Sequence, residues 1–292
     1  MAQRRNWSLI GIPDHEAVFN VGGRVGAASG PAAFRRVFRR LSGELPLHEL
    51  LKHDVDVQEL GPDIEKNHER AATLIESCHS ATGTTVVVGG SHDHGYSQVL
   101  GISRSIQNLE GLKNKKRKNP LTLGCLNLDA HLDVRPSHPK ITSGSPFYLA
   151  IENKVILPEH LIEFGIQEHC NAPLLWAYVK SRRVQVIPWS RLRGGVAVDH
   201  FATALKSLSS KVDAIVLSFD LDAVAQAFSP GVSAPQAEGL SSSEALACIE
   251  IAAENPKVVS LGIFELNPEH DHDDQSARLA ATAAYHFAAR KV

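Results

Sequence analysis

Three short apolar runs in this chain each lead into side chains that can ligate a metal ion. The runs cover residues 84–88, 121–128 and 214–219, and they lack the polar alternation of a strand with one exposed face. The candidate ligands that follow them are, in order, His92, then Asp129, His131 and Asp133, then Asp220 and Asp222. Because alternate residues of an extended chain project to the same side, ligands spaced two apart converge on one point. The sequence therefore predicts buried strands whose ends carry a metal-binding cluster.

Further apolar runs alternate with segments of helical periodicity along the chain. The other predicted strands cover residues 9–12, 161–166, 184–187 and 258–266, with a weaker candidate at 54–60. The predicted helices cover residues 32–41, 64–78, 173–180, 200–208, 245–253 and 277–289. Strands that alternate with helices require right-handed crossovers, which give a mostly parallel sheet with helices on both faces. We expect a single domain over residues 1–292, because no linker or repeat divides the chain.

Capping residues mark two of the predicted helix starts. Ser241 is followed three residues later by Glu244, which is the pattern of a capping box before the helix at 245–253. Asp273 and Asp274 are expected to cap the last helix in a similar way.

The composition excludes several classes of partner. Charged residues make up 21% of the chain and the net charge is -2, so no general field attracts nucleic acid or a membrane surface. The basic run at residues 113–118 lacks interleaved aromatic residues and is interpreted as a solvated loop. No stretch approaches the roughly 20 apolar residues of a membrane span, and the cysteines lack the spacing of a disulfide framework or zinc ribbon. We expect a soluble, cytoplasmic protein without nucleic-acid or membrane partners.

The candidate ligands favour a metal centre over simple helix caps. A single Asp at the end of a strand commonly caps a helix or opens a turn. Three strand ends that bring His or paired Asp together would also bring together like charges, which repel unless a cation compensates them. Imidazole and carboxylate ligands without thiolate favour manganese, with iron, cobalt or zinc as alternatives. Two such ions about 3.5–4 Å apart would activate a bridging water, which indicates hydrolysis.

Four segments resemble, in order, the signature sequences of the ureohydrolase family, which includes arginase, agmatinase and formimidoylglutamase. They are GGSHD at residues 89–93, DAHLD at 129–133, SFDLD at 218–222 and FELNP at 264–268. The resemblance implies a three-layer α/β/α fold around a parallel sheet of eight strands. It also implies two Mn²⁺ ions per subunit, attack of a bridging hydroxide on a planar C=N carbon, and a homo-oligomer, as is common in this family.

The same resemblance divides the candidate ligands between two metal ions. His92, Asp129, Asp133 and Asp220 would hold one ion, and His131, Asp129, Asp220 and Asp222 would hold the other. Asp129 and Asp220 would therefore bridge the two ions, and Asp133 would also accept a proton. Glu265 matches the carboxylate that pairs with the cationic amidine or guanidine of the substrate, although a helix cap is the alternative role for this residue.

The loops beside these motifs favour the formimidoylglutamases within the family. Arginases place a proton-shuttling histidine where Phe147 stands here, and they often carry serine at the position of Asp93. The segments that resemble formimidoylglutamases are TSGSPF at residues 142–147, DAHLDVRP at 129–136, GIQ at 165–167, PGVSAPQ at 230–236 and FELNPEHDHDDQSARLAA at 264–281. The resemblance implies hydrolysis of N-formimidoyl-L-glutamate to L-glutamate and formamide in histidine degradation. The alternatives are agmatinase, arginase or a guanidino-acid hydrolase, and a catalytically silent subunit that binds metabolites or a partner.

The substrate implied by this resemblance carries two carboxylates, which need donors in the pocket. Arg135 is the first candidate, because its planar guanidinium matches a carboxylate, with a surface ion pair as the alternative. Arg24 lies in a glycine-rich loop that lets backbone approach a ligand, and Ser143 is a further candidate that could instead bond within its own turn. His94 and His138 are interpreted as ordinary histidines near the motifs rather than as proton shuttles.

Overall fold

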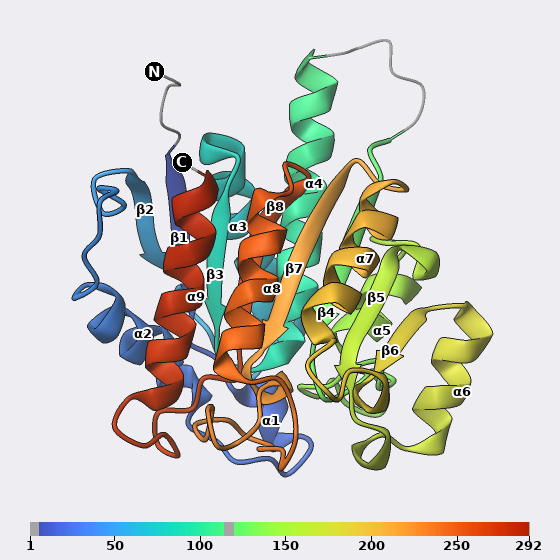
Figure 1. The fold of residues 1–292 in the computed structure, drawn as a ribbon. Coiled ribbons are helices and arrows are strands. Elements are labelled where there is room, and N and C mark those ends of the chain that lie inside the picture. Colours follow the sequence, from blue (N-terminus) through green and yellow to red (C-terminus); the bar gives the residue numbers. More distant parts are fainter. Residues whose placement is uncertain (1–5, 114–119, 292) are drawn as a thin grey trace.

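Eight parallel strands form one central sheet in the computed structural model, which describes residues 6–113 and 120–291 (Figure 1). In chain order the strands are β1 (Trp7–Ile12), β2 (Leu51–Asp56), β3 (Thr85–Gly89), β4 (Leu123–Leu128), β5 (Leu161–Ile166), β6 (Gln185–Pro188), β7 (Ala214–Asp220) and β8 (Val258–Phe264). Their spatial order is β2-β1-β3-β8-β7-β4-β5-β6. The parallel eight-stranded sheet is therefore confirmed, and the carboxyl ends of its strands share one edge (Figure 1).

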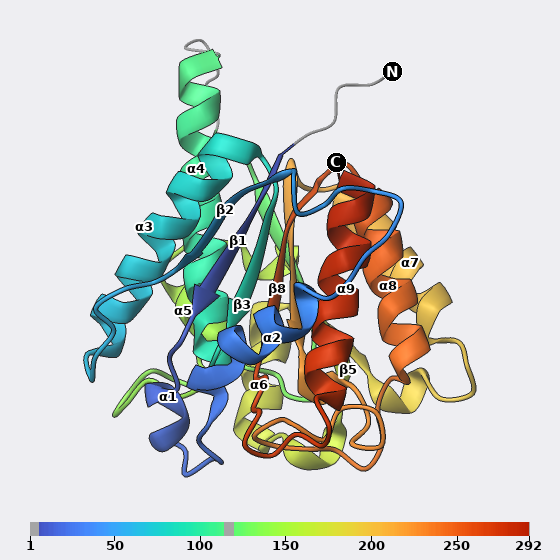
Figure 2. The same cartoon turned by 90° about the vertical axis from the view of Figure 1, so that its left-hand side faces the viewer.

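Helices cover both faces of this sheet and complete the three layers, as Figure 2 shows. The layer on one face consists of α3 (Ile64–Thr82), α4 (Gly95–Lys113), α5 (Pro146–Glu152) and α6 (Pro173–Arg182). The layer on the other face consists of α2 (Gly30–Phe38), α7 (Ala197–Ser209), α8 (Ser242–Glu254) and α9 (Gln275–Lys291). A short helix, α1 (Glu16–Phe19), lies near the edge where the strands end (Figure 1).

The inner strands are buried on both faces, which explains their unbroken apolar runs. Every residue of β4 is buried, and its side chains alternate between two separate cores. Leu126 and Leu128 belong to one core, whereas Leu123 and Cys125 belong to the core on the opposite face. Full burial of a Leu side chain contributes about 1.5–3 kcal/mol, so a slip of register that exposed these residues would be costly.

The edge strand β2 differs from its predicted position. The weaker strand candidate at residues 54–60 lies instead at Leu51–Asp56. Asp54 and Asp56 of this strand form ion pairs with Arg35, each with an N–O distance of 2.6 Å. The strand therefore exposes charged side chains to solvent, and its apolar pattern is correspondingly weak.

The predicted helices omit α1, α4 and α5. The 19 residues of α4 include Gly95, Gly101 and Gly111, which lower its intrinsic helix propensity. Gly101 also allows a close helix contact, because a Cβ atom at this position would lie 2.6 Å from the backbone oxygen of Ala72 in α3. Packing against α3 therefore outweighs the weak helix propensity of α4, and no local sequence pattern indicates that packing.

One of the two predicted caps is confirmed and the other is wrong. Ser241 and Glu244 form the complete capping box at the start of α8. At the start of α9, however, the carboxylate of Asp271 accepts the backbone N–H groups of residues 276 and 277, at 2.9 and 3.1 Å. Asp273 and Asp274 adopt positive φ angles of 48° and 57°, which form the turn before the helix rather than its cap.

Two predictions concern membrane and nucleic-acid partners. Among the described helices, none has both the length and the apolar character needed to cross a bilayer. Residues 114–119, which include most of the basic run, lie outside the described residues.

Candidate active site

Four neighbouring strands bring the candidate ligands to one edge of the sheet. In spatial order these strands are β3, β8, β7 and β4, although they come from distant parts of the chain. The residues at or just beyond their ends are His92 after β3, Glu265 after β8, Asp220 and Asp222 at β7, and Asp129, His131 and Asp133 after β4. This edge is where parallel α/β sheets hold their ligands.

His92 and three carboxylates form the first ligand group, which we call the His92 group. The distances from His92 Nδ1 to the nearest carboxylate oxygens are 3.1 Å for Asp129, 2.8 Å for Asp133 and 3.0 Å for Asp220. All four side chains are buried. One imidazole nitrogen and three oxygens at these separations form a group that can surround a single cation.

His131, Asp129 and Asp222 form the second ligand group, which we call the His131 group. His131 Nδ1 lies 2.9 Å from Asp222 Oδ2 and 3.6 Å from Asp129 Oδ1. Asp129 thus offers Oδ2 to the first group and Oδ1 to the second, which is the arrangement of a bridging ligand. Asp220 contacts the first group through Oδ2, and its Oδ1 accepts the backbone N–H of Asp222 at 2.8 Å.

The ring of His92 presents a nitrogen that fits a metal ion. Its Nε2 lies 2.8 Å from the hydroxyl oxygen of Ser218. Its buried Nδ1 makes no well-formed hydrogen bond to any described residue, although three carboxylates surround it. A histidine that donates Nε2–H to a hydroxyl presents the lone pair of Nδ1 to its other neighbours, as metal-binding histidines do. The donor set therefore fits a divalent cation.

The electrostatics of both groups favour added positive charge. Burial, together with the carboxylates of Asp222 and Asp129, raises the pKa of Asp220 well above its usual range. Burial also raises the pKa of Asp222 to about 6, although His131 acts in the opposite direction. Burial lowers the pKa of His92, but the surrounding carboxylates outweigh this effect and raise it well above its usual range. Groups that retain protons in this way would exchange them for metal ions.

Glu265 lies beside the His92 group at the end of β8. Its Oε1 accepts the backbone N–H of His92 at 2.9 Å, and its Oε2 accepts the hydroxyl of Ser233. Burial, with a further contribution from Asp222, raises the pKa of Glu265 to about 7 against the effect of these two donors. Sequence reasoning missed Ser233, although it lies within the PGVSAPQ segment. No local spacing links residues 233 and 265.

A cavity of about 210 Å³ opens directly onto these groups. Its polar lining consists of His92, His131, Asp133, Arg135, Ser143, Asp220, Asp222, Ser233 and Glu265. Val18, Val21, Gly23 and Ala234 complete the described lining. Five of the six candidate ligands, all except Asp129, therefore face one cavity together with Glu265 and two of the predicted substrate-binding residues.

The two predicted substrate-binding arginines lie in different places. Arg135 lines the cavity, and no carbonyl or carboxylate in the described part of the chain holds its guanidinium. Arg24 is absent from the described lining, because its guanidinium donates to the backbone oxygens of Val232 and Ser233, the latter at 3.1 Å. Arg24 therefore braces the loop that carries Ser233. His138 is exposed and also lies outside the described lining.

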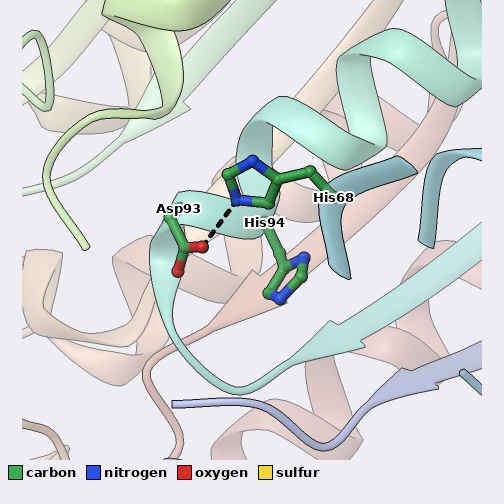
Figure 3. A group of neighbouring side chains, drawn as sticks. All are labelled: His68, Asp93 and His94. Atoms are coloured by element: carbon green, nitrogen blue, oxygen red, sulfur yellow. Dashed lines mark hydrogen bonds and ion pairs between the residues drawn. The ribbon is translucent and has the colours of Figure 1, made fainter. Parts of the chain in front are cut away.

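A third group of ligand-type side chains consists of Asp93 and His94, which follow His92 in the chain, and His68 of α3 (Figure 3). His68 Nε2 lies 2.6 Å from Asp93 Oδ2, and this contact is drawn in Figure 3. The nitrogens of His94 are both engaged elsewhere, Nε2 with Asp14 and Nδ1 with Ser97, each at 3.0 Å. We interpret this group as a brace that ties α3 and the segment after β1 to the His92 loop. His68 and Asp14 carry no sequence signal, because they lie outside every recognised motif.

Comparison with known proteins gives the family. The Arginase family model matches residues 5–289. Formimidoylglutamase of Hahella chejuensis is 31% identical over 96% of this chain and 84% of its own, and that of Geobacillus kaustophilus is 29% identical over 98% and 85%. The structure resembles Trypanosoma cruzi formiminoglutamase with Mn²⁺, with a TM-score of 0.82 and 29% identity over 98% of this chain and 94% of that one. It also resembles Bacillus subtilis formimidoylglutamase, with a TM-score of 0.85 and 25% identity over 99% of this chain and 88% of that one. The chain therefore belongs to the arginase family.

Proposed function

We propose that this protein is a formimidoylglutamase, which hydrolyses N-formimidoyl-L-glutamate to L-glutamate and formamide. The observation that carries this proposal is the convergence of two ligand groups, a buried carboxylate and an unpaired arginine on one cavity. The near full-length similarity to proteins named formimidoylglutamase supports the same reaction.

The metal ligands in this proposal are the six residues of the two groups. His92 and Asp133 would hold one Mn²⁺ ion, His131 and Asp222 would hold the other, and Asp129 and Asp220 would contribute to both sites. When bound, the two ions would activate water for attack and stabilise the negative charge that develops in the transition state. The mixed imidazole and carboxylate donor set supports manganese, and the Mn²⁺ bound to the Trypanosoma cruzi relative supports it further.

Glu265 binds the cationic formimidoyl group in this proposal. Its side chain lines the cavity, its carboxylate is held by His92 and Ser233, and burial disfavours its charge. A substrate amidinium would restore the ionised form and gain an ion pair shielded from water. This pairing orients the C=N carbon towards the ligand groups, and Asp133, which also lines the cavity, accepts the proton from the attacking water.

Arg135 binds a carboxylate of the glutamate moiety. Its guanidinium lines the cavity and has no acidic partner in the described part of the chain, so it can form a bidentate pair with the substrate. Ser143 lines the same cavity and adds a neutral donor. Arg24 contributes indirectly by holding the loop of Ser233. Agmatine has no carboxylate for Arg135, which favours the formimidoyl substrate over it.

A substrate panel tests this proposal on manganese-loaded protein. N-formimidoyl-L-glutamate, agmatine, arginine and a guanidino acid are compared by kcat/KM, with formamide and urea measured separately. The proposal expects formamide from the first compound at the highest kcat/KM. Faster release of urea from any guanidine compound would assign the chain to another hydrolase of the family. Turnover of no compound by protein that binds two metal ions would indicate a silent subunit.

We also infer that the protein works in the cytoplasm as a homo-oligomer. The four cysteines form no disulfide, which fits a reducing compartment. Light scattering coupled to size-exclusion chromatography measures the number of subunits, and a monomer would contradict the second inference.

A further inference from the structure

A row of polar side chains crosses the sheet one step beneath the candidate ligands. Asn127 of β4 is in register with Glu163 of β5 on one side and with Ser218 of β7 on the other. Asn127 precedes Asp129 by two residues, and Ser218 precedes Asp220 by two, so each shares a face of its strand with a ligand. Asn127, Glu163 and Ser218 are all fully buried. Sequence reasoning assigned no role to any of the three.

This row contacts the ligands directly. The side-chain nitrogen of Asn127 donates to Asp129 Oδ2 at 3.1 Å and to Glu163 Oε2 at 2.9 Å. Both hydrogens of the amide are therefore used. Ser218 Oγ lies 2.8 Å from His92 Nε2. Two members of the His92 group thus depend on this row for their orientation.

Two buried oxygens in this row have no hydrogen-bond partner among the described residues. They are Glu163 Oε1 and Asn127 Oδ1. The two side chains already share one hydrogen bond, which the amide nitrogen of Asn127 donates to Glu163 Oε2. An ionised Glu163 would leave two buried acceptors without a donor, which is costly. A proton on Oε1 would let the acid donate to Oδ1, and the carboxyl and amide groups would then be joined by two antiparallel hydrogen bonds.

We propose that Glu163 is a neutral carboxylic acid that donates its proton from Oε1 to Asn127 Oδ1, and that this acid–amide pair positions Asp129 within the metal centre. Glu163 is a positioning residue in this scheme, since it reaches the ligands only through Asn127. The inference about the pair stands on its contacts, and its effect on Asp129 rests on the proposed metal-binding function.

The surroundings of Glu163 support its neutral form. Burial raises the pKa of Glu163 well above its usual range, and the nearby carboxylates of Asp129 and Asp133 act in the same direction. His92 and the hydrogen bond from Asn127 act in the opposite direction without outweighing them. The thiol of Cys125, whose own pKa is raised by burial, adds no charge. A neutral Glu163 avoids a further negative charge beneath the carboxylates.

The pair has a mechanical consequence for the bridging ligand. Because the acid engages both polar atoms of the Asn127 side chain, the amide cannot flip, and its second N–H points at Asp129 Oδ2. The backbone N–H of His131 donates to the other oxygen, Oδ1, at 2.6 Å. The two oxygens of Asp129 are therefore each held by one donor and keep lone pairs for the two ligand groups. Loss of such outer contacts typically weakens metal binding by roughly 10- to 100-fold.

Two variants of Glu163 separate this proposal from simple packing. In Glu163→Gln the side-chain oxygen can accept from Asn127 and the side-chain nitrogen can donate to Asn127 Oδ1, which reproduces the hydrogen bonds of the neutral acid. Glu163→Leu keeps a similar volume without these bonds. After the metal is stripped with a chelator, a manganese titration followed by electron paramagnetic resonance should show native affinity for Glu163→Gln. It should show roughly 10- to 100-fold weaker binding for Glu163→Leu.

Infrared spectroscopy of the manganese-loaded full chain tests the proton itself. The difference spectrum between native protein and Glu163→Gln should contain the C=O stretching band of a protonated carboxylic acid. Glu254→Gln, at an exposed carboxylate, should keep the band. The loaded form is used because its ligand carboxylates are then ionised and contribute no such band.

Either of two results would overturn the proposal. One is a difference spectrum between native protein and Glu163→Gln without a carboxylic acid band. The other is a loss of manganese affinity in Glu163→Gln as large as in Glu163→Leu, which is expected if the native residue were ionised. The infrared result holds even if Glu163→Leu fails to fold. Neither readout needs turnover, so a failure of the proposed substrate is distinguishable from a failure of this inference.

Discussion

The backbone N–H of His92 donates a hydrogen bond to the carboxylate of Glu265, with 2.9 Å between the nitrogen and Oε1. The backbone N–H of Glu265 in turn donates to the carbonyl oxygen of Gly90 at 2.8 Å. These two bonds join the loop after β3 to the end of β8, so a candidate ligand and the candidate substrate carboxylate form one rigid unit. A Cβ atom at position 90 would lie 1.8 Å from the backbone oxygen of Asp14, which explains the glycine there.

Replacement of Glu265 by glutamine should lower kcat/KM strongly without loss of metal. The neutral amide cannot form an ion pair with the substrate amidinium, and loss of one partner of a buried charge pair costs about 2–5 kcal/mol, or roughly 30-fold and more. Elemental analysis should still find the native metal content, because Glu265 is not a proposed ligand. Glu269→Gln, at an exposed carboxylate of the same segment, is the matched control. Native kcat/KM in Glu265→Gln would remove this residue from substrate binding.

Replacement of Asp222 by alanine should abolish turnover while the fold survives. The variant removes the carboxylate that lies 2.9 Å from His131 Nδ1, so one of the two proposed metal ions loses a ligand. Burial already disfavours the charge of Asp222, so little stability is lost in the metal-free protein. Metal per chain, circular dichroism and turnover are measured beside Asp199→Ala, which changes an exposed aspartate. Full turnover by Asp222→Ala would refute the binuclear mechanism.

Replacement of Arg135 by glutamine should raise the KM for N-formimidoyl-L-glutamate with a smaller effect on kcat. A hydrogen-bonded charge contributes about 1.5–3 kcal/mol, which corresponds to a roughly 10- to 100-fold increase in KM. Arg24→Gln should instead lower kcat, because it frees the loop that holds Ser233 against Glu265. Steady-state kinetics of both variants distinguish the two roles. An unchanged KM in Arg135→Gln would exclude the proposed carboxylate contact.

His79 should make the stability of the protein depend on pH away from the active site. Burial lowers the pKa of this α3 residue from 6.5 to about 4, so the unfolded chain binds more protons between these values. The stability that His79 contributes is present above pH 6.5 and is lost as the pH falls towards 4. Between pH 7 and pH 5 the loss should be about 2 kcal/mol.

Urea unfolding of native protein and His79→Gln at these two pH values measures this effect. The variant lacks the titrating ring, so its free energy of unfolding should fall less between pH 7 and pH 5. Equal pH dependence in both proteins would show that the ring of His79 is not held in its neutral form.

Several features of the fold could be predicted from the sequence, and others could not. The inner strands were predicted closely because burial on both faces leaves an unbroken apolar run, which is a local pattern. The helix α4 escaped prediction because its stability comes from packing of Gly101 against α3. The cap of α9 was assigned to Asp273 and Asp274 because they are next to the helix, whereas the chain turns there and brings Asp271 into place.

By itself, the sequence determined which side chains could ligate metal and that neighbouring ligands converge, because spacing by two along a strand sets the direction of each side chain. Only the tertiary structure decided that β8 lies between β3 and β7 and so brings Glu265 beside His92. It also decided that Arg135 faces the cavity while Arg24 bonds to a loop, and that Glu163 meets Asn127. The physical reason is that these contacts depend on the order and register of strands far apart in the chain, which no local spacing encodes.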